Sequence, residues 1–302
     1  MFVRMEELTQ CPVCAVVNTL EKKVSTVRDH SLSGESFSIS RCTECSVLLT
    51  DPRPKEVEIG AYYDFPKYVS HRDDAPGLIN WLYQQARRYT TSQKLRLIEK
   101  VRKKSGADST LLDYGCGTGF FLQAAIERGW QAVGIEVSET ARQTAADRVK
   151  GRVFEQLDEL ADGATFGVIT LWHVLEHIHE LNATLGEIIA RLAPSGTLII
   201  AVPNPASSDA GQYQEWWAAF DVPRHLYHFP PQAIHRLMQR HGMEVVEQIG
   251  QPLDALYIGL LSEKYRRGSA LKGIINGVRS DVSAWKTGNY SSIIYVIKRK
   301  AK

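Results

Sequence analysis

The chain has 302 residues, of which 44% are hydrophobic and 23% charged, enough for one large α/β domain and a smaller module. A formal net charge of +2 at pH 7 does not indicate a nucleic-acid or membrane partner. The first residues carry charges where a signal peptide would be apolar, and the longest apolar runs are strand-sized. We therefore expect a cytoplasmic protein whose thiols stay reduced.

Four of the five cysteines form two Cys-x-x-Cys pairs, Cys11 with Cys14 and Cys42 with Cys45. Each pair can present two thiolates from one turn, and two such turns make a tetrahedral four-sulfur zinc site. The cysteines could instead form a redox-active pair or have no role. Neither alternative explains why two Cys-x-x-Cys pairs are present. The sequence predicts a structural Zn²⁺ in a zinc-ribbon-like module over residues 1–50. Since apolar residues are scarce there, the metal would supply much of the folding free energy.

Residues 51–108 are expected to form a linker and a helical lid. Asp51-Pro52-Arg53-Pro54 is typical of a turn, and a helix follows that should end at Ser105-Gly106. Between them stands a cluster of aromatic residues: Tyr62, Tyr63, Phe65 and Tyr68.

The third zone, residues 109–302, alternates strand and helix patterns, which predicts a parallel sheet with helices on both faces. Strands are expected at 110–114, 132–136, 152–155, 167–171, 197–202, 244–248 and 293–297. Helices are expected near 119–129, 138–149, 181–192 and 231–241. The stretch before the last strand shows less regular patterning.

A glycine-rich turn, Asp113-Tyr114-Gly115-Cys116-Gly117-Thr118-Gly119, follows the first strand of this zone. Missing side chains let backbone N–H groups approach a ligand at the start of the next helix. Phe120 stands where a dinucleotide fingerprint needs its third glycine, which disfavours NAD and FAD. Asp113 could receive a ligand's ammonium group. Glu136 ends the next strand, near the spacing at which an acid accepts ribose hydroxyls, although either acid alone could be a strand end or a cap.

Four motifs in order make the sequence resemble the class I S-adenosylmethionine (SAM)-dependent methyltransferases. Residues 112–119 resemble the family's first motif, 134–136 the second, 166–177 the fourth strand with its Leu-Glu-His ending, and 193–198 the turn into the fifth strand. The resemblance implies a Rossmann-like seven-stranded sheet over 109–302 whose last strand is antiparallel. It also implies an enzyme that transfers a methyl group from S-adenosyl-L-methionine.

The resemblance further implies which residues lie at the cofactor: Asp113, Gly115, Cys116, Gly117, Glu136, Gln156, Leu157 and Leu171. Asp113 and the first two loop glycines would hold the methionine moiety, and Glu136 the ribose. Gln156 and Leu157 would lie against the adenine, although an acidic residue is common in the family at the first of these positions. Cys116 fills a variable loop position and is assigned no chemistry.

The SAM sulfonium already activates its methyl group, but methylation of a hydroxyl or amine also needs a base, for which histidine is suited at neutral pH. One histidine cluster follows the fourth strand. In the resembling family His173 would border the methionine and acceptor pocket. Aromatic residues of the lid segment also line that pocket in the family, so Tyr62, Tyr63 and Tyr68 could do so here or could equally be packing residues. Glu176 and His177 are expected to hold the turn together, and His179 to be exposed.

The second cluster lies in an aromatic, Pro-marked loop, residues 216–229, a reasonable wall for an acceptor pocket. Its Pro-Arg-His-Leu-x-His-Phe resembles a signature of methyltransferases with polar, often sugar- or quinone-like acceptors. His225 is the favoured base, with Arg224 orienting an anionic group and His228 as a substitute base. Equally, the two histidines could cap the helix near Pro230 and hydrogen-bond within the fold.

The sequence therefore predicts methyl transfer to oxygen or carbon of a small-molecule acceptor such as a sugar, quinone or polyketide-like metabolite. An RNA or protein methyltransferase that docks its substrate through the ribbon is an alternative. The balanced charge and the lack of an Asn-Pro-Pro-Tyr type motif after the fourth strand speak against it. A non-catalytic SAM-binding protein is the other alternative, for which we would expect a degenerate glycine loop. Nucleic acid is thus not expected as a partner.

Overall fold

The computed structural model describes residues 3–63 and 78–300, except for the side chains of residues 78–87. The chain divides into two compact units, each assembled from separate segments. The first unit comprises Met1–Asp64, His173–Asn182 and Ile200–Val296, and the second comprises Phe65–Trp172, Ala183–Ile199 and Ile297–Lys302. This grouping differs from the linear division expected at 1–50, 51–108 and 109–302, because the N-terminal residues share a unit with much of the C-terminal half.

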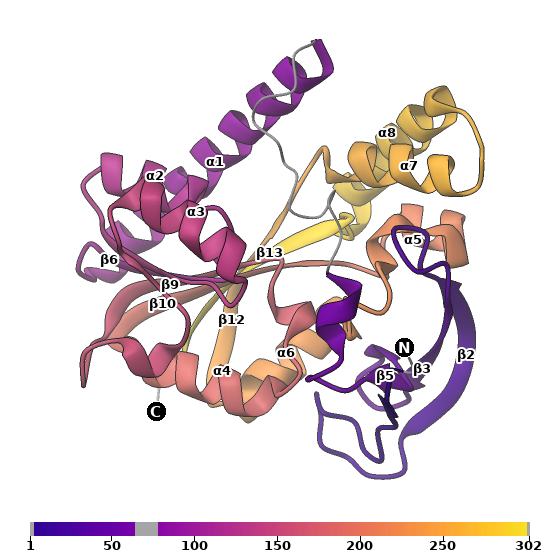
Figure 1. Ribbon diagram of the computed structural model, residues 1–302, viewed down its shortest axis with the longest axis horizontal. Helices are drawn as coiled ribbons and strands as arrows, with labels where there is room; N and C mark the ends of the chain where they lie inside the picture. Colours follow the sequence, from indigo (N-terminus) through magenta and orange to yellow (C-terminus); the bar gives the residue numbers. More distant parts are fainter. Residues whose placement is uncertain (1–2, 64–77, 301–302) are drawn as a thin grey trace. The chain divides into compact units, whose positions relative to one another are not determined.

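The second unit contains the first strands of the α/β sheet and the helices between them (Figure 1). In chain order these elements are α1 (Leu78–Ser105), β6 (Thr110–Tyr114), α2 (Phe120–Glu127), β7 (Gln131–Ile135), α3 (Glu139–Val149), β8 (Val153–Phe154), β9 (Phe166–Trp172) and all but the first two residues of α4 (Leu181–Ala190). The β6 strand pairs in parallel with both β7 and β9, so that Leu112 lies beside Val133 and Ile169. The central strand β9, FGVITLW, is apolar except for Thr170, as expected for a sheet covered on both faces.

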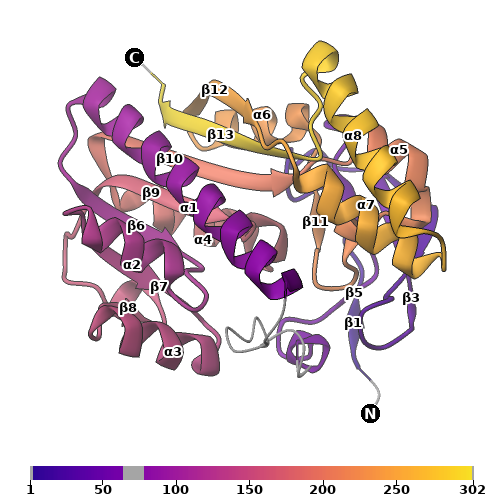
Figure 2. The same cartoon turned by 90° about the horizontal axis from the view of Figure 1, so that it is seen from above.

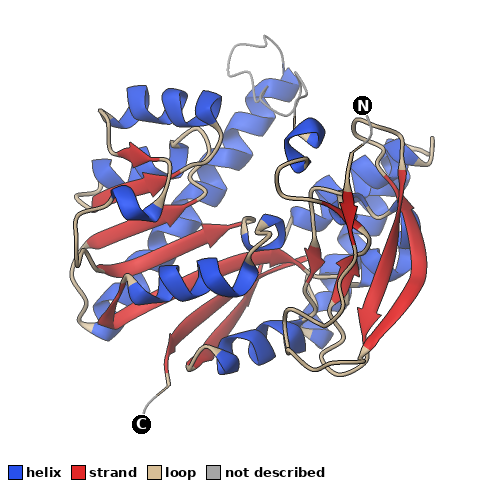
Figure 3. Ribbon diagram, turned by 60° about the horizontal axis from the view of Figure 1, so that its bottom comes forward, coloured by secondary structure: helices blue, strands red, loops and turns tan. Residues whose placement is uncertain are grey.

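The full sheet has seven strands in the order β12-β13-β10-β9-β6-β7-β8, which confirms the expected seven-stranded architecture. Figure 3 shows the strands in red and the helices in blue. Its remaining strands are β10 (Leu192–Pro203), β12 (Met243–Gly250) and β13 (Ser292–Arg299). Strands added after β6 continue on one side through β7 and β8 and then on the other through β9 and β10. The strand order therefore reverses at β6, and open α/β sheets bind ligands at the carboxyl ends of the strands at such a point.

The first unit contains an antiparallel sheet in the order β11-β4-β3-β2. Its strands are β2 (Leu20–Arg28), β3 (Ser36–Cys42), β4 (Leu48–Thr50) and β11 (Tyr227–His228). A two-stranded sheet, β1 (Met5–Glu6) with β5 (Arg53–Pro54), accompanies it. Tyr227 pairs with Leu49 and His228 with Leu48. The second histidine cluster is thus joined to the N-terminal sheet by strand pairing, which no local pattern indicated.

Helices complete the first unit. They are α5 (Ser208–Tyr213), α6 (Pro231–Arg240), α7 (Asp254–Tyr265) and α8 (Ala270–Thr287). Short 3-10 turns occupy Ile59–Tyr62, Leu175–His177, Gln214–Trp216 and Ala218–Phe220, and a further one in the second unit occupies Leu157–Glu159. The stretch with less regular patterning is therefore a helical pair. None of the described helices combines the length and the apolar composition that crossing a bilayer would require.

Candidate active site

The glycine loop after β6 adopts a backbone that only glycine takes without strain. The φ angles of Gly115, Gly117 and Gly119 are +73°, +56° and +79°, all in the left-handed region. A Cβ atom at Gly119 would meet the Cβ of Ala145 in α3 at 3.0 Å, whereas one at Gly117 would meet nothing within 4 Å. The last glycine therefore serves helix packing, and Gly117 borders open space that a ligand can occupy.

Asp113 ends β6 as a buried carboxylate, 2% exposed. Its Oδ1 accepts a hydrogen bond of 2.7 Å from the hydroxyl of Thr170 in β9. Burial raises the pKa of Asp113 to about 7, against the lowering effects of that hydrogen bond and of Lys94. The carboxylate is therefore only partly ionised near neutral pH, and a ligand's ammonium group placed beside it would complete its ionisation.

Glu136, directly after β7, holds the glycine loop. Its Oε2 accepts the backbone N–H of Gly117 at 2.8 Å, and its Oε1 accepts that of Ser138 at 2.9 Å. The carboxylate expected at the ribose thus lies against the loop expected at the methionine moiety. Two acids and an open left-handed loop at the strand-order reversal fit SAM, which carries an ammonium group and two ribose hydroxyls.

The other residues expected at the cofactor differ in exposure. The Gln156 side chain is exposed, whereas Leu157 and Leu171 are buried in the core, so the two leucines are core residues of the fold. Burial raises the pKa of the Cys116 thiol, which therefore stays neutral. A Cβ atom at Gly134 would lie 2.5 Å from the Cys116 sulfur, so this glycine provides the space that the thiol occupies.

The four N-terminal cysteines converge. Their sulfur atoms lie within 4.8 Å of one another, with Cys11 to Cys45 at 3.6 Å and Cys14 to Cys42 at 3.5 Å. All four thiols are free and buried. Zinc–sulfur bonds of about 2.3 Å in a tetrahedron place the sulfurs about 3.8 Å apart. The arrangement therefore fits a closed four-sulfur zinc site, with no position left for a substrate.

His177 and His225 lie together, with ring centroids 4.6 Å apart in an edge-to-face arrangement. The Nδ1 of His177 is 3.0 Å from the carbonyl oxygen of Arg224 and 2.9 Å from the hydroxyl of Tyr63. The Nδ1 of His225 is 2.9 Å from the carbonyl oxygen of Ala219. Since a carbonyl only accepts, Nδ1 of His225 carries the proton of the neutral ring and Nε2 keeps the lone pair.

Glu176 is the buried carboxylate of this cluster, 1% exposed, and within the described residues neither of its oxygens has a hydrogen-bond partner. One of its oxygens and one ring nitrogen each of His177 and His225 lie within 4.8 Å of one another, and His173 Nδ1 is 3.6 Å from Oε1. Burial would raise the pKa of Glu176, but these imidazoles outweigh it and lower the pKa. The carboxylate is therefore ionised and faces imidazoles.

One expectation for this turn is corrected. His179 is buried rather than exposed, because its Nε2 bonds to the carbonyl oxygen of Pro54 at 3.0 Å. His173 starts the turn in the left-handed region, with φ of +58°, a conformation that non-glycine residues adopt at a cost.

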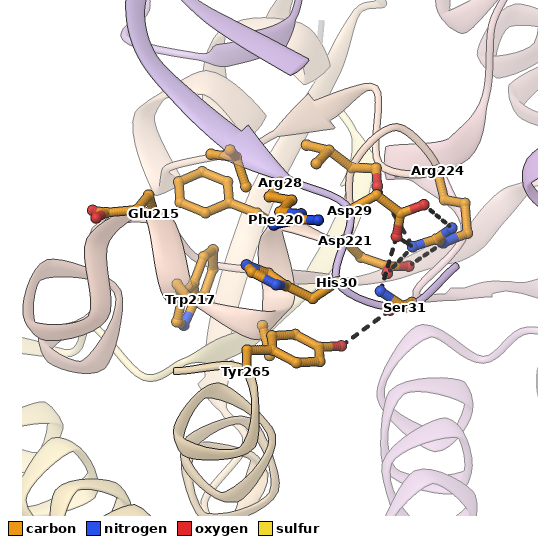
Figure 4. Close-up of a pocket in the computed structure, with 13 residues that line it drawn as sticks. Arg28, Asp29, His30, Ser31, Glu215, Trp217, Phe220, Asp221, Arg224 and Tyr265 are labelled. Atoms are coloured by element: carbon orange, nitrogen blue, oxygen red, sulfur yellow. Dashed lines mark hydrogen bonds and ion pairs between the residues drawn. The ribbon is translucent and has the colours of Figure 1, made fainter. Parts of the chain in front are cut away.

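Arg224 is buried in ion pairs with the protein's own carboxylates (Figure 4). Its Nη2 donates to Asp29 at 2.9 Å and to Asp221 at 2.7 Å, and its Nη1 to the carbonyl oxygen of Tyr62 at 3.2 Å. The expectation that Arg224 orients an anionic acceptor is therefore replaced by a structural role. Burial alone would raise the pKa values of Asp29 and Asp221, but Arg224 lowers both.

His228 is placed differently from His225. It is buried, and its Nε2 lies 3.3 Å from the hydroxyl of Thr50. Burial lowers the pKa of His228 to about 3, so the ring is neutral and bonded within the fold. Neither histidine caps α6, which begins after Pro230 without a side-chain cap. Tyr68, expected as a possible pocket residue, and Phe65 of the same aromatic cluster lie outside the described residues.

Sequence reasoning missed Asp29, which follows β2 and pairs with Arg224 from 195 positions further along the chain. No local signal marked it, because a single acid after a strand is common on a solvated surface. It also missed that Glu176 has no hydrogen-bond partner within the described residues. The Leu-Glu-His motif contributed to the family resemblance, but it did not indicate which groups surround this acid.

A seven-stranded sheet with a glycine loop and two strand-end acids at its reversal point defines a SAM-binding α/β methyltransferase fold. A family model described as a methyltransferase domain matches residues 83–248, more than half of the chain. The chain belongs to this family, the class I SAM-dependent methyltransferases, and its cofactor is SAM.

The ubiquinone biosynthesis O-methyltransferase of Idiomarina loihiensis is 26% identical over 168 residues, 51% of this chain and 69% of that protein. The protein of the same name from Rhodopseudomonas palustris is 25% identical over 156 residues, 46% of this chain and 60% of its own length. The magnesium protoporphyrin IX methyltransferase structure from Synechocystis, with S-adenosylhomocysteine bound, has a TM-score of 0.51 at 14% identity, covering 80% of this chain and 97% of its own. At this identity the structural likeness shows the fold alone.

Proposed function

We propose that this enzyme transfers the methyl group of SAM to a hydroxyl oxygen of a small-molecule acceptor of the phenol, quinol or sugar type. The names of its relatives, ubiquinone biosynthesis O-methyltransferases, support an oxygen acceptor and a quinol-like ring. The observation that carries the proposal is the buried pair of His225 and Glu176, since methylation of a hydroxyl releases a proton that a base must take.

In this proposal His225 receives the acceptor's proton at Nε2. Its Nδ1–H is fixed on the carbonyl oxygen of Ala219, which sets the tautomer that a base requires. The ionised carboxylate of Glu176 stabilises the imidazolium that forms, as a buried acid does for a histidine base. Burial lowers the pKa of His177 to about 4, so that ring stays neutral and does not oppose the charge on His225.

When bound, SAM supplies the activated methyl group and leaves as S-adenosylhomocysteine. The chain's own contribution on the cofactor side is to hold the amino-acid part beside Asp113 and the ribose beside Glu136. The four-cysteine cluster takes no part in the chemistry in this proposal: a structural Zn²⁺ would be held by Cys11, Cys14, Cys42 and Cys45 and would order the N-terminal sheet.

The test is turnover of His225→Gln with a panel of catechols, quinols and sugars and with labelled SAM. We expect kcat to fall by about 10²- to 10⁴-fold, as for loss of a general base. S-adenosylhomocysteine affinity, measured by calorimetry, should stay unchanged. His235→Gln, on α6 and bonded to the Gln248 side chain, is the matched control and should keep full turnover.

Two outcomes would overturn the assignment of the base. Full turnover in His225→Gln would exclude it directly. A second equivalent of bound divalent metal, lost in Glu176→Gln, would instead assign the three converging donor atoms to a cation. If no acceptor in the panel is methylated but S-adenosylhomocysteine binds, the acceptor class rather than the cofactor site is wrong.

A further inference from the structure

The last two helices expose a stripe of large apolar side chains. On α8 the stripe consists of Leu271, Ile274, Ile275, Val278, Val282 and Trp285. Spacings of three and four residues place them on one face of the helix. Leu271 is 65% exposed and Trp285 73%. A contiguous apolar face of this kind on a protein surface indicates a binding surface. We call this set the α8 stripe.

The opposite face of α8 is built from small residues and is the buried one: Gly273, Asn276, Gly277, Ser280 and Ala284. This face packs on α7, and the two helices lie side by side in both views (Figures 1 and 2). A Cβ atom at Gly277 would lie 2.7 Å from the Leu256 Cα, and one at Gly273 would lie 2.9 Å from the Gly259 carbonyl oxygen.

The orientation of α8 is therefore set by close backbone packing, which large side chains would prevent. The helix cannot turn its leucine, isoleucine and tryptophan side chains inward without losing this contact with α7. The packing of α8 on α7 thus keeps the side chains of the α8 stripe exposed on the outer face of the helix.

Charge shows which partner this surface suits. Every exposed charged residue from Asp254 to Thr287 is basic: Lys264, Arg266, Arg267, Lys272, Arg279 and Lys286. The acids of this segment are at least partly buried, and Asp281 accepts the backbone N–H of Leu253. The net charge of +2 for the whole chain conceals this local excess.

Three of the bases lie next to the stripe. Lys272, Arg279 and Lys286 are seven residues apart, so they follow one flank of α8. Their aliphatic stems can lie along an apolar surface while the charged ends reach outward. Trp285, near the end of the helix, is of the type enriched where hydrocarbon meets headgroups.

We propose that α8 docks on an anionic phospholipid membrane, lying in the plane of the interface with its stripe in the headgroup–acyl boundary. Interfacial helices combine such an apolar face with basic flanks and an exposed tryptophan. A second copy of this chain fits less well, because a two-fold contact would bring the same basic flanks together. The inference stands apart from the proposed methyl transfer, because it concerns binding alone.

The experiment is flotation of the full chain with vesicles of phosphatidylcholine, alone or mixed with phosphatidylglycerol. We expect binding to the mixed vesicles that weakens as salt is raised. The variant Lys272→Gln/Arg279→Gln/Lys286→Gln should lower the partition coefficient by about 100-fold or more, given the attraction of each base to an anionic surface. The variant Val278→Asn/Val282→Asn should lower it as well, with an unchanged thermal midpoint because both side chains are exposed.

Matched controls lie elsewhere on the surface. Lys103→Gln/Lys104→Gln at the end of α1 removes exposed charge, and Val246→Ser on β12 removes an exposed apolar side chain. Both should bind like the wild type. Absence of binding to the mixed vesicles, or equal binding by the triple charge variant, would overturn the proposal. So would a dimer, seen by sedimentation equilibrium, that Val278→Asn/Val282→Asn dissociates while the vesicles stay unbound.

Discussion

Asp113 and Glu176 are both buried carboxylates, 2% and 1% exposed, yet their pKa values move in opposite directions. Burial raises the pKa of Asp113 to about 7, since its described hydrogen bond is to a neutral hydroxyl. At Glu176 burial acts in the same direction, but the surrounding imidazoles outweigh it and lower the pKa. The comparison shows that partners, rather than burial, decide the charge of a buried acid.

The two regions also differ in how they are assembled. The cofactor loop is built from one continuous stretch, residues 110–136, in which each backbone turn is encoded locally. The histidine cluster takes its groups from three separate segments, around Tyr63, Glu176 and His225, and its strand β11 pairs with β4. Substitutions that disturb long-range packing in the first unit should therefore leave the cofactor loop intact.

Removal of the N-terminal metal should have the largest effect, and it tests whether the two regions are stabilised independently. In Cys42→Ser, or after chelation, we expect loss of about one zinc per chain and unfolding of the β11-β4-β3-β2 sheet, since structural zinc supplies apparent free energies of folding of about 10–16 kcal/mol. Hydrogen exchange should rise in residues 36–50 and 227–228, because β11 pairs with β4. Residues 110–136 should stay protected, with S-adenosylhomocysteine affinity retained.

Cys116→Ser, which alters the cysteine outside the cluster, is the control for the metal experiment and should keep the zinc. A wild-type chain that contains no metal and still protects residues 36–50 would contradict the zinc site. Loss of the cofactor affinity together with the zinc would show that the two regions do not fold independently.

Arg224→Met should have the next largest effect. It leaves Asp29 and Asp221 without their shared guanidinium, and breaking a buried ion pair typically costs about 3–5 kcal/mol. Urea unfolding measures this loss of stability directly. Arg236→Met, at an exposed position on α6, should change stability by no more than about 0.5 kcal/mol.

The partner carboxylates provide a second check on Arg224. Adding Asp29→Asn and Asp221→Asn to Arg224→Met should restore part of the stability, because the uncompensated charges are then gone. A fully additive loss in that triple variant would mean that the guanidinium acts mainly through packing.

Gly134→Ala should lower the stability by a smaller amount, and the effect should be confined to the surroundings of the glycine loop. The added Cβ would lie 2.5 Å from the Cys116 sulfur and 2.9 Å from the Leu122 Cδ2, so these side chains must move, at a typical cost of about 1–3 kcal/mol. Gly186→Ala in α4 is the control: nothing lies within 4 Å, and the change should stabilise by about 0.4–1 kcal/mol. Equal stability of the two variants would show that Cys116 and Leu122 can move aside without a loss of folding free energy.

Much of the sheet could be predicted because strands such as β9 and β13 contain long apolar runs next to turn residues. The first strand was expected at 110–114 and is Thr110–Tyr114. The α8 helix was not predicted, although its apolar residues recur every three or four positions. Gly273 and Gly277 lower helix propensity, and here they are required by the approach of α7 rather than by a helix end.

At the candidate site, contacts between residues close in the sequence could be predicted, and contacts between distant residues could not. Asp113 and Glu136 could be placed because strand ends of a parallel sheet share one edge and the loop joins them directly. The pairing of Arg224 with Asp29 could not be predicted, since Asp29 comes from the other end of the chain and its hairpin turn carries no sign of the contact. Strand β11, two residues long, is too short for any pattern to reveal.

The smallest expected effect is a change in cofactor affinity with pH, caused by ionisation of Asp113. With a pKa of about 7 this acid is mostly protonated at pH 6 and mostly ionised at pH 8. If its carboxylate receives the cofactor's ammonium group, S-adenosylhomocysteine affinity should be about tenfold higher at pH 8 than at pH 6, by the ratio of the ionised fractions. Calorimetry at the two pH values measures this ratio.

Two variants separate Asp113 from other titrating groups. In Asp113→Asn the affinity should be low and independent of pH, because no carboxylate remains to ionise. In Glu136→Gln it should also be low, through loss of the ribose acceptor, but the rise with pH should persist. A wild-type affinity that is flat, or that grows as the pH falls, would mean that the ammonium group is held elsewhere. Asp113 would then be buried for the hydrogen bond from Thr170 alone.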